Sequence, residues 1–207
     1  MNFFINIYLA VEDDLSEAIL RRILRERPHR YNVQPVLKQG GFGYLKKNCK
    51  AFNKLASKNT PVLMLTDLDK QVCASELIRQ WLPEPRNENF IFRVAVREVE
   101  AWLLADVASL GNYMAVRSRK PFPSPENLDD PKNELLKFAL KSAKRIIRES
   151  ITLYNQNGRL YQGPDYNPSL AEYVNSTWPL AKAAQKCPSL KKLLKALETL
   201  EISMKGK

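Results

Sequence analysis

Two aspartates, Asp67 and Asp69, directly follow a run of apolar residues in the stretch "PVLMLTDLDKQ", residues 61–71. If this stretch stays extended through residue 69, the two side chains point to the same side of a strand and Leu68 points to the other. Two carboxylates at the end of a buried strand are typical of a metal site. Aspartate also commonly ends strands and begins turns, so the pair alone leaves both interpretations open.

Further carboxylates follow other predicted strands. Glu12 follows the first strand, and Glu98 and Glu100 follow the fourth. In a parallel sheet, ligands gather beyond the carboxyl ends of the strands, so we expect these side chains to reach one edge. Converging carboxylates repel one another unless a cation joins them, and oxygen ligands suit Mg²⁺ or Mn²⁺. We therefore predict a site for one or two such ions, which would act on a phosphate group.

Other chemistries have little support in the sequence. His29 is the only histidine, so a catalytic triad that uses histidine has a single, poorly placed candidate. The glycine-rich stretch "GGFGYLKK" does not have the spacing of a nucleotide-binding P-loop. It could still let the backbone approach a phosphate, with Lys46 and Lys47 beyond it, or it could be a plain turn.

The elements that would position the carboxylates alternate along the chain. Strands are predicted at residues 2–11, 31–39, 61–66 and 90–96, with the second at an edge because it contains Pro35. Helices are predicted at 14–28, 44–57, 73–82 and 98–110. This order predicts an α/β fold with a mainly parallel sheet flanked by helices, followed by a C-terminal helical extension.

A stretch rich in proline and polar residues indicates a domain boundary. We predict an α/β domain over residues 1–113, a connecting segment over 114–131 and a basic helical extension over 132–207. Residues 133–150 are predicted to form one amphipathic helix, residues 163–169 a loop, and the remainder two further helices around 170–174 and 189–201.

Positive charge gathers in the second half of the chain. The net charge is +11, and residues 111–207 hold 17 Lys and Arg against nine Asp and Glu. This excess favours an anionic partner such as nucleic acid, although a charged helix face can also be simply solvated. The predicted contacts to the phosphate backbone are Lys46, Lys47, Lys137, Lys141, Lys144, Arg145 and Arg148.

The expected location is the cytoplasm. The three cysteines have no zinc-like spacing, which is usual in a reduced compartment. No apolar stretch has the length of a membrane span, so no membrane association is expected. The N-terminal apolar run lacks a basic leader and meets Glu12 at once, so we do not expect a signal peptide.

Three segments in order resemble a known family. "AVEDDLSEAILRRIL", "VLMLTDLDK" and "FRVAVREVEAWLLAD" are similar to small stand-alone Toprim-domain proteins related to the overcoming-lysogenisation-defect (OLD) nucleases. "DDPKNELLKFA" and the C-terminal segments also resemble these proteins, so the resemblance spans nearly the whole chain. It differs in the first motif, where Asp13 replaces a glycine and Glu17 comes five residues after the glutamate instead of four.

The resemblance implies a Toprim fold and a Mg²⁺-dependent nuclease that acts on DNA or RNA. Glu12, Asp67 and Asp69 match the family's glutamate and Asp-x-Asp positions. The third acidic cluster maps onto Glu98 and Glu100, which would project about 200° apart if residue 98 were already helical, so we favour Glu98 as the ligand. Glu12 is the expected proton-transfer group. A separate ABC- or AAA-type ATPase partner and a role in anti-phage defence are implied by the resemblance alone.

Two alternatives remain open on the sequence. The acidic cluster could hold a structural metal or salt bridges in a non-catalytic adaptor whose basic helices bind a partner. Alternatively, the chain could be a response-regulator receiver phosphorylated on Asp67, with Lys120 as the lysine that a receiver carries beside its phosphorylated aspartate. The strand at 90–96 lacks the terminal serine or threonine of a receiver, which counts against this second alternative. Whether the protein forms a homo-oligomer is not decided by the sequence.

Overall fold

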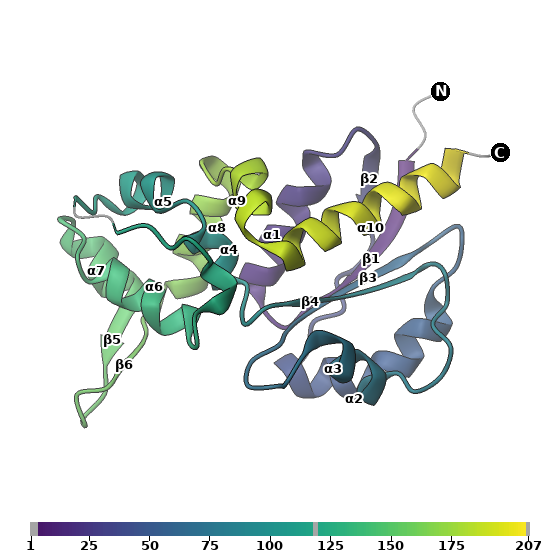
Figure 1. Cartoon of the computed structure of the whole chain (residues 1–207), viewed down its shortest axis with the longest axis horizontal. Helices are drawn as coiled ribbons and strands as arrows, with labels where there is room; N and C mark the ends of the chain where they lie inside the picture. The colour runs from purple at the N-terminus through teal and green to yellow at the C-terminus, as the bar shows by residue number, and fades with distance from the viewer. Residues whose placement is uncertain (1–3, 118–119, 206–207) are drawn as a thin grey trace. The chain divides into compact units, whose positions relative to one another are not determined.

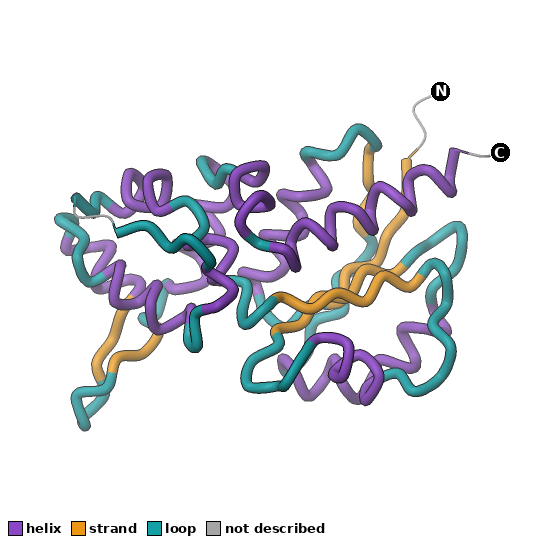
Figure 2. The backbone as a smooth tube through the Cα atoms, viewed as in Figure 1, coloured by secondary structure: helices purple, strands orange, loops and turns teal. Residues whose placement is uncertain are grey.

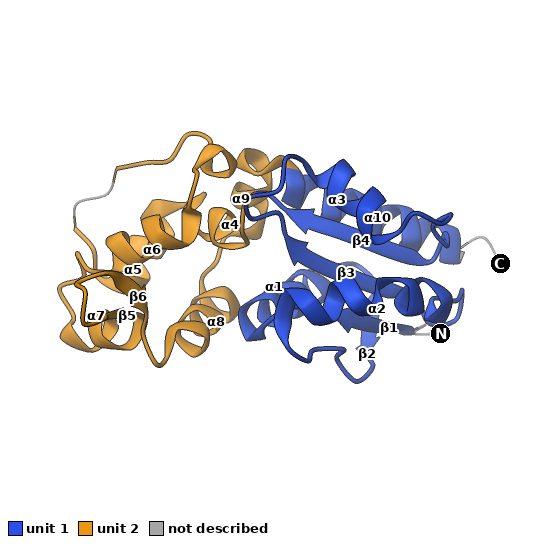
Figure 3. Cartoon of the chain, turned by 90° about the horizontal axis from the view of Figure 1, so that it is seen from below, with its two compact units in different colours: residues 1–96, 189–207 blue, residues 97–188 orange. Residues whose placement is uncertain are grey.

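The structure, a computed structural model, describes residues 4–117 and 120–205. The chain divides into two compact units (Figure 3), the first formed by residues 1–96 and 189–207 and the second by residues 97–188. The sequence placed a boundary at 114–131 instead, because that segment is rich in proline. Proline and polar residues mark an irregular path, whereas a compact unit is defined by which side chains share a core.

The first unit is an α/β layer structure (Figure 1). In chain order it contains β1 (Phe4–Ala10), α1 (Asp14–Arg25), β2 (Arg30–Val33), α2 (Gly41–Leu55), β3 (Val62–Asp67), α3 (Ala74–Trp81), β4 (Phe90–Ala95) and α10 (Pro188–Lys205).

The four strands form one parallel sheet in the order β2-β1-β3-β4. The predicted α/β fold with a parallel sheet is therefore confirmed, as is the edge position of β2. The chain adds β2 on one side of β1 and then returns to place β3 and β4 on the other side. The strand order thus reverses between β1 and β3, where doubly wound sheets leave a crevice at their carboxyl ends.

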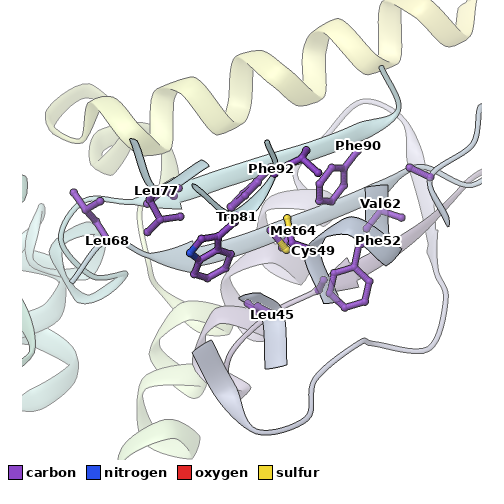
Figure 4. Close-up of a cluster of buried hydrophobic side chains, with 14 residues drawn as sticks. Leu45, Cys49, Phe52, Val62, Met64, Leu68, Leu77, Trp81, Phe90 and Phe92 are labelled. Carbon is purple, nitrogen blue, oxygen red and sulfur yellow. The ribbon is translucent and has the colours of Figure 1, made fainter. Parts of the chain in front are cut away.

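Helices cover both faces of this sheet (Figure 1), with α2 and α3 on one side and α1 and α10 on the other. Alternation along the strands decides which residues meet which helices. Figure 4 shows the cluster under α2 and α3, where the Trp81 and Phe92 ring centroids lie 5.7 Å apart. The members labelled there are Leu45, Cys49, Phe52, Val62, Met64, Leu68, Leu77, Trp81, Phe90 and Phe92.

The second unit is mainly helical. It contains α4 (Glu100–Leu104), α5 (Val107–Met114), the 3₁₀ turn η1 (Pro125–Asn127), α6 (Pro131–Ala139), α7 (Arg145–Ile151), β5 (Thr152–Tyr154), β6 (Leu160–Gln162), α8 (Tyr166–Ser176) and α9 (Leu180–Lys186). Trp102 and Trp178 are buried at its centre, and the Trp178 Nε1 donates a hydrogen bond to the Trp102 carbonyl at 3.3 Å.

The prediction of one continuous helix over 133–150 is wrong. The helix stops at Ala139 and restarts at Arg145. Between these ends the Ser142 hydroxyl donates to the Met114 carbonyl, and the Ala143 N–H donates to the Ala115 carbonyl at 3.0 Å. The backbone groups of this segment therefore bond to another part of the unit instead of continuing the helix, an exchange that side-chain periodicity does not reveal.

Two further elements of the second unit differ from the sequence expectation. The predicted loop at 163–169 ends early, because α8 begins at Tyr166. An antiparallel hairpin, β5–β6, interrupts the predicted helical extension, with Leu153 opposite Tyr161. Figure 2 shows the hairpin as the orange strand pair within the second unit. Each strand has only three residues, which is too short for alternation to give a signal.

None of the helices in the described part of the chain combines the length and apolar character that a bilayer crossing requires.

Candidate functional site

The reversal of strand order places two predicted site residues at neighbouring strand ends. Glu12 comes two residues after the end of β1, and Asp67 is the last residue of β3. These strands are hydrogen-bonded neighbours. Glu12 and Asp67 are therefore brought together beyond the carboxyl ends of β1 and β3.

The Glu12 carboxylate is fixed by two donors from β3. Its Oε1 accepts hydrogen bonds from the Thr66 hydroxyl and from the Asp67 backbone N–H, the latter at 3.0 Å. Thr66 is buried. Burial raises the pKa of Glu12, the two hydrogen bonds oppose this effect, and the charges of Asp69 and Asp13 add to it. A glutamate that is held in place and has a raised pKa accepts a proton more readily than an ordinary carboxylate does.

Asp69 reaches this region by a different path from the one predicted. The Leu68 N–H donates to the Ala95 carbonyl at 2.9 Å and its side chain is buried, but Asp69 has a φ of 50°. The chain therefore leaves the extended conformation, and the argument that Asp67 and Asp69 alternate with Leu68 along one strand is wrong for Asp69. Aspartate tolerates this left-handed conformation better than most residues. The charge of Asp69 nevertheless raises the pKa of Glu12, so the Asp69 carboxylate lies near the Glu12 carboxylate.

Other acidic residues of the segment after β1 have structural partners. Asp13 caps α1, because its Oδ1 accepts a hydrogen bond from the Ser16 N–H at 2.8 Å. Asp14 forms an ion pair with the Lys38 ammonium, and Glu17 lies 2.8 Å from the same ammonium. Glu17, whose spacing differs from the first motif of the Toprim proteins, therefore has a structural role, because its ion pair with Lys38 holds α1 in place.

Glu98 and Glu100 lie in the second unit and share one lysine. The Lys132 Nζ is 3.7 Å from Glu98 Oε1 and 3.7 Å from Glu100 Oε1. The Lys132 backbone N–H also donates to Glu98 Oε2 at 2.8 Å. The condition for the two carboxylates to project about 200° apart is not met, because α4 begins at Glu100 and residue 98 is not yet helical.

Glu100 is the most deeply buried carboxylate of this pair. Its exposed fraction is 1%, its Oε1 accepts a hydrogen bond from the Tyr166 hydroxyl at 2.8 Å, and its Oε2 has no hydrogen-bond partner among the described residues. Burial raises the pKa of Glu100 to about 7, the Lys132 charge opposes this rise, and the Glu98 charge adds to it. A carboxyl group with these surroundings changes its protonation state in the physiological range.

Glu100→Gln is expected to flatten the pH dependence of stability. The folded state holds a proton on Glu100 up to a pH of about 7, whereas the unfolded chain releases it near 4.5. The folded state therefore binds more protons between these values, and the wild-type free energy of unfolding falls as pH rises through the window, on the order of 1 kcal/mol per unit. Denaturant unfolding between pH 5 and 8 measures this slope. Glu134→Gln, on an exposed ion pair, should keep the wild-type slope, and an unchanged slope in Glu100→Gln would contradict the assignment.

The carboxylates after β1 and β3 suit a hard divalent cation in donor type, but they are too few to enclose it with protein ligands alone. Among residues 4–117 and 120–205, no group of three or more His, Cys, Asp or Glu side chains is placed to hold a metal ion. Mg²⁺ usually keeps several waters and needs only one or two protein carboxylates together with phosphate oxygens. Glu12, Asp67 and Asp69 therefore fit Mg²⁺ or Mn²⁺ that also contacts a phosphate, and they do not form an all-protein cage.

The predicted phosphate-binding residues lie on the surface of both units. Lys46 and Lys47 are exposed on α2, and Lys141 and Lys144 are exposed between α6 and α7. The remaining three have intramolecular partners: Lys137 pairs with Glu134, Arg145 pairs with Glu149, and Arg148 donates to the Ser142 carbonyl. Arg148 thus helps to hold the helix break in place.

Sequence reasoning did not identify three of the residues that organise these carboxylates. Thr66 donates a hydrogen bond to Glu12, and Lys132 lies between Glu98 and Glu100. Tyr166 donates a hydrogen bond to Glu100. Thr66 could have been found, since it precedes Asp67 at the strand end. Lys132 and Tyr166 are distant in sequence from Glu98 and Glu100, so no local pattern points to them.

Comparison with known proteins gives one match. A protein-family model described as "Domain of unknown function (DUF4276)" matches residues 12–198. No curated protein and no solved structure matches the chain.

Proposed function

The chain belongs to the DUF4276 family, and we propose that it is a Mg²⁺- or Mn²⁺-dependent nuclease of the Toprim type that cleaves phosphodiester bonds of DNA or RNA. One observation carries this proposal. The Glu12 carboxylate is held by Thr66 and the Asp67 N–H at the strand ends where the strand order reverses, and Asp69 is close enough to raise its pKa. Fixed carboxylates at this place in a parallel sheet are suited to phosphate chemistry that uses a metal.

The proposed roles follow from the surroundings of each residue. Asp67 and Asp69 offer oxygen ligands, and Glu12 offers its second oxygen as a ligand or moves a proton. A divalent cation held there would supply stabilisation for the charge that develops on the phosphate. The roles of Glu98 and Glu100 as additional ligands stay predictions.

Nucleic acid is the proposed partner because of the net charge of +11. Exposed lysines such as Lys46, Lys47, Lys141 and Lys144 would contact phosphates without reading bases. Each phosphate that the protein neutralises releases counterions, so binding is expected to weaken steeply as salt increases.

The biological setting is proposed from the resemblance to the small Toprim proteins related to OLD nucleases. By this resemblance the protein acts in the cytoplasm as an effector of anti-phage defence, together with a separate ABC- or AAA-type ATPase. Such an effector needs to be restrained until its partner signals infection.

The test of the proposed function is metal dependence of cleavage. DNA and RNA are incubated with the protein in Mg²⁺, in Mn²⁺ and in EDTA, with and without a candidate partner ATPase. Cleavage that needs the divalent ion is the expected result. Equal cleavage in EDTA, or no cleavage of either nucleic acid with the ATPase present, would contradict the proposal.

A specific observation also favours a second candidate, a non-catalytic adaptor. Leu153, Tyr154 and Tyr161 of the β5–β6 hairpin are exposed, and Ile146 of α7 is 71% exposed. Exposed apolar side chains on a short hairpin are common at protein interfaces. An adaptor would keep its partner when Asp67 and Asp69 are both replaced by alanine and would lose it when Tyr154 and Tyr161 are replaced by serine.

A further inference from the structure

A cavity of about 420 Å³ lies in the first unit, between β4 and the C-terminal half of α10. Its lining on β4 runs from Phe90, the first residue of the strand, to Arg93, whereas Asp67 pairs with Ala95 at the other end of the sheet. At about 3.3 Å per strand residue, Arg93 is roughly 7 Å along the strand from Ala95. The segments that carry Glu12 and Asp67 contribute none of the lining residues of this cavity. Basic and apolar side chains line it together: Lys58, Arg86 and Arg93 with Ile91, Ala196 and Leu200.

Arg93 points away from the main apolar cluster of the unit. Phe90 and Phe92 enter the cluster under α2 and α3 (Figure 4), and strand alternation directs Arg93 to the opposite face, toward α10. In the part of the chain that the structure describes, no group accepts a hydrogen bond from the buried Arg93 Nε. No ion pair of Arg93 with a described carboxylate is formed either.

The electrostatic surroundings of Arg93 are unfavourable for a cation. Burial lowers the pKa of Arg93, and the charge of Arg86 lowers it further. Unpaired charges that are removed from water normally destabilise a protein. Arg93, Arg86 and Lys58 line the same cavity. An anion that binds all three side chains is the most direct explanation for placing a half-buried arginine beside two other cations.

The charge count selects the kind of anion. The cavity has three cationic side chains and one carboxylate, Glu88, so a ligand with two or more negative charges balances it better than a monocarboxylate does. Arginine also matches the geometry of phosphate oxygens. The volume lies within the range of small-molecule sites, which is larger than a phosphate group alone requires.

We propose that this cavity binds a phosphorylated small molecule of the nucleoside di- or triphosphate class. The phosphates contact Arg93, Arg86 and Lys58, and the apolar part of the ligand lies against Ile91 and Leu200. This site is independent of the proposed nuclease activity, because it needs neither Glu12 nor Asp67. A ligand here contacts both β4 and α10, so it stabilises the packing of α10 on the sheet.

The test is calorimetric titration of the whole protein with ADP, ATP and inorganic pyrophosphate in EDTA, so that binding to Glu12, Asp67 and Asp69 through a metal does not contribute. Binding of ADP or ATP is expected, and Arg93→Met should weaken it by about 10- to 100-fold, since hydrogen bonds to charged groups are lost. Arg30→Gln is the matched control, because it removes an exposed arginine from β2 outside the cavity, and it should bind as the wild type does.

Further variants and ligands distinguish a nucleotide from a free phosphate and show whether a loss of binding comes from misfolding. Arg93→Met removes a half-buried charge that pairs with no described carboxylate, so it should fold and melt no lower than the wild type without ligand. Arg86→Gln and Lys58→Gln change exposed residues and should each weaken ADP binding. Equal affinity for ADP and pyrophosphate would overturn the assignment of Ile91 and Leu200. No binding of any of the phosphates, or equal binding by Arg93→Met, would overturn the site.

Discussion

Asp67→Asn is expected to reduce metal-dependent cleavage of nucleic acid by at least about 100-fold, the scale seen when a group that acts on the reacting charge is removed. Asparagine has nearly the same shape, and the contact that the residue makes with Glu12 comes from its backbone N–H. The variant should therefore keep the position of Glu12 and lose only the charge at the end of β3. The measurement is the initial rate of cleavage of a labelled oligonucleotide in Mg²⁺.

Asp14→Asn is the matched control for this experiment. Asp14 also follows β1, but its side chain is 69% exposed and pairs with Lys38. An exposed ion pair contributes little to stability, so this variant should cleave at close to the wild-type rate. If Asp67→Asn and Asp14→Asn cleave equally fast, Asp67 has no role in the chemistry.

Glu201→Ala is expected to lower the free energy of unfolding by about 3 kcal/mol, because it leaves a partly buried guanidinium without its partner. Glu201 on α10 accepts hydrogen bonds from Arg27 Nε at 2.9 Å, from Arg27 Nη2 at 2.6 Å and from the Tyr31 hydroxyl at 2.8 Å. This carboxylate joins the last helix to Arg27, which lies between α1 and β2, and to Tyr31 of β2. The Arg27 side chain is 18% exposed, so the expected loss is at the low end of values for buried pairs.

The same group should make the first unit sensitive to acid. Burial would raise the pKa of Glu201, but the hydrogen bonds from Arg27 and Tyr31 outweigh it and lower the pKa. The stabilisation by Glu201 is thus complete above the unfolded pKa of about 4.5 and is lost as pH falls through the lower folded value. Denaturant unfolding at pH 7 and pH 4 measures both effects. Glu149→Ala removes an exposed pair with Arg145 and should show no measurable loss, and a Glu201→Ala protein as stable as the wild type would refute the prediction.

The sheet of the first unit could be predicted from the sequence, because its strands are short apolar runs separated by helices with clear periodicity. The strands Val62–Asp67 and Phe90–Ala95 fall where the apolar runs predict them. The second unit was predicted less well. Its helix break at Ser142 depends on hydrogen bonds to distant backbone groups, and the strands of its hairpin have only three residues each, so neither feature leaves a periodic signal in the local sequence.

The proximity of Glu12 and Asp67 was predicted from the sequence, because parallel strands deliver side chains to one edge of a sheet. Strand alternation failed at Asp69, where a positive φ ends the extended path. The helical geometry considered for Glu98 does not apply, because Glu98 precedes α4. Arguments from periodicity hold only while the chain stays inside one regular helix or strand. They do not hold for site residues just beyond the end of such an element.

The first unit is assembled from two stretches of sequence that the whole second unit separates. During synthesis, β1 to β4 emerge long before α10, so one face of the sheet remains without the helix that carries Leu193, Leu197 and Glu201. The second unit is continuous and can complete its core first. A chain cut after residue 113 would therefore lack this cover and expose an apolar sheet face, so a truncated first unit should be insoluble unless α10 is joined back to it.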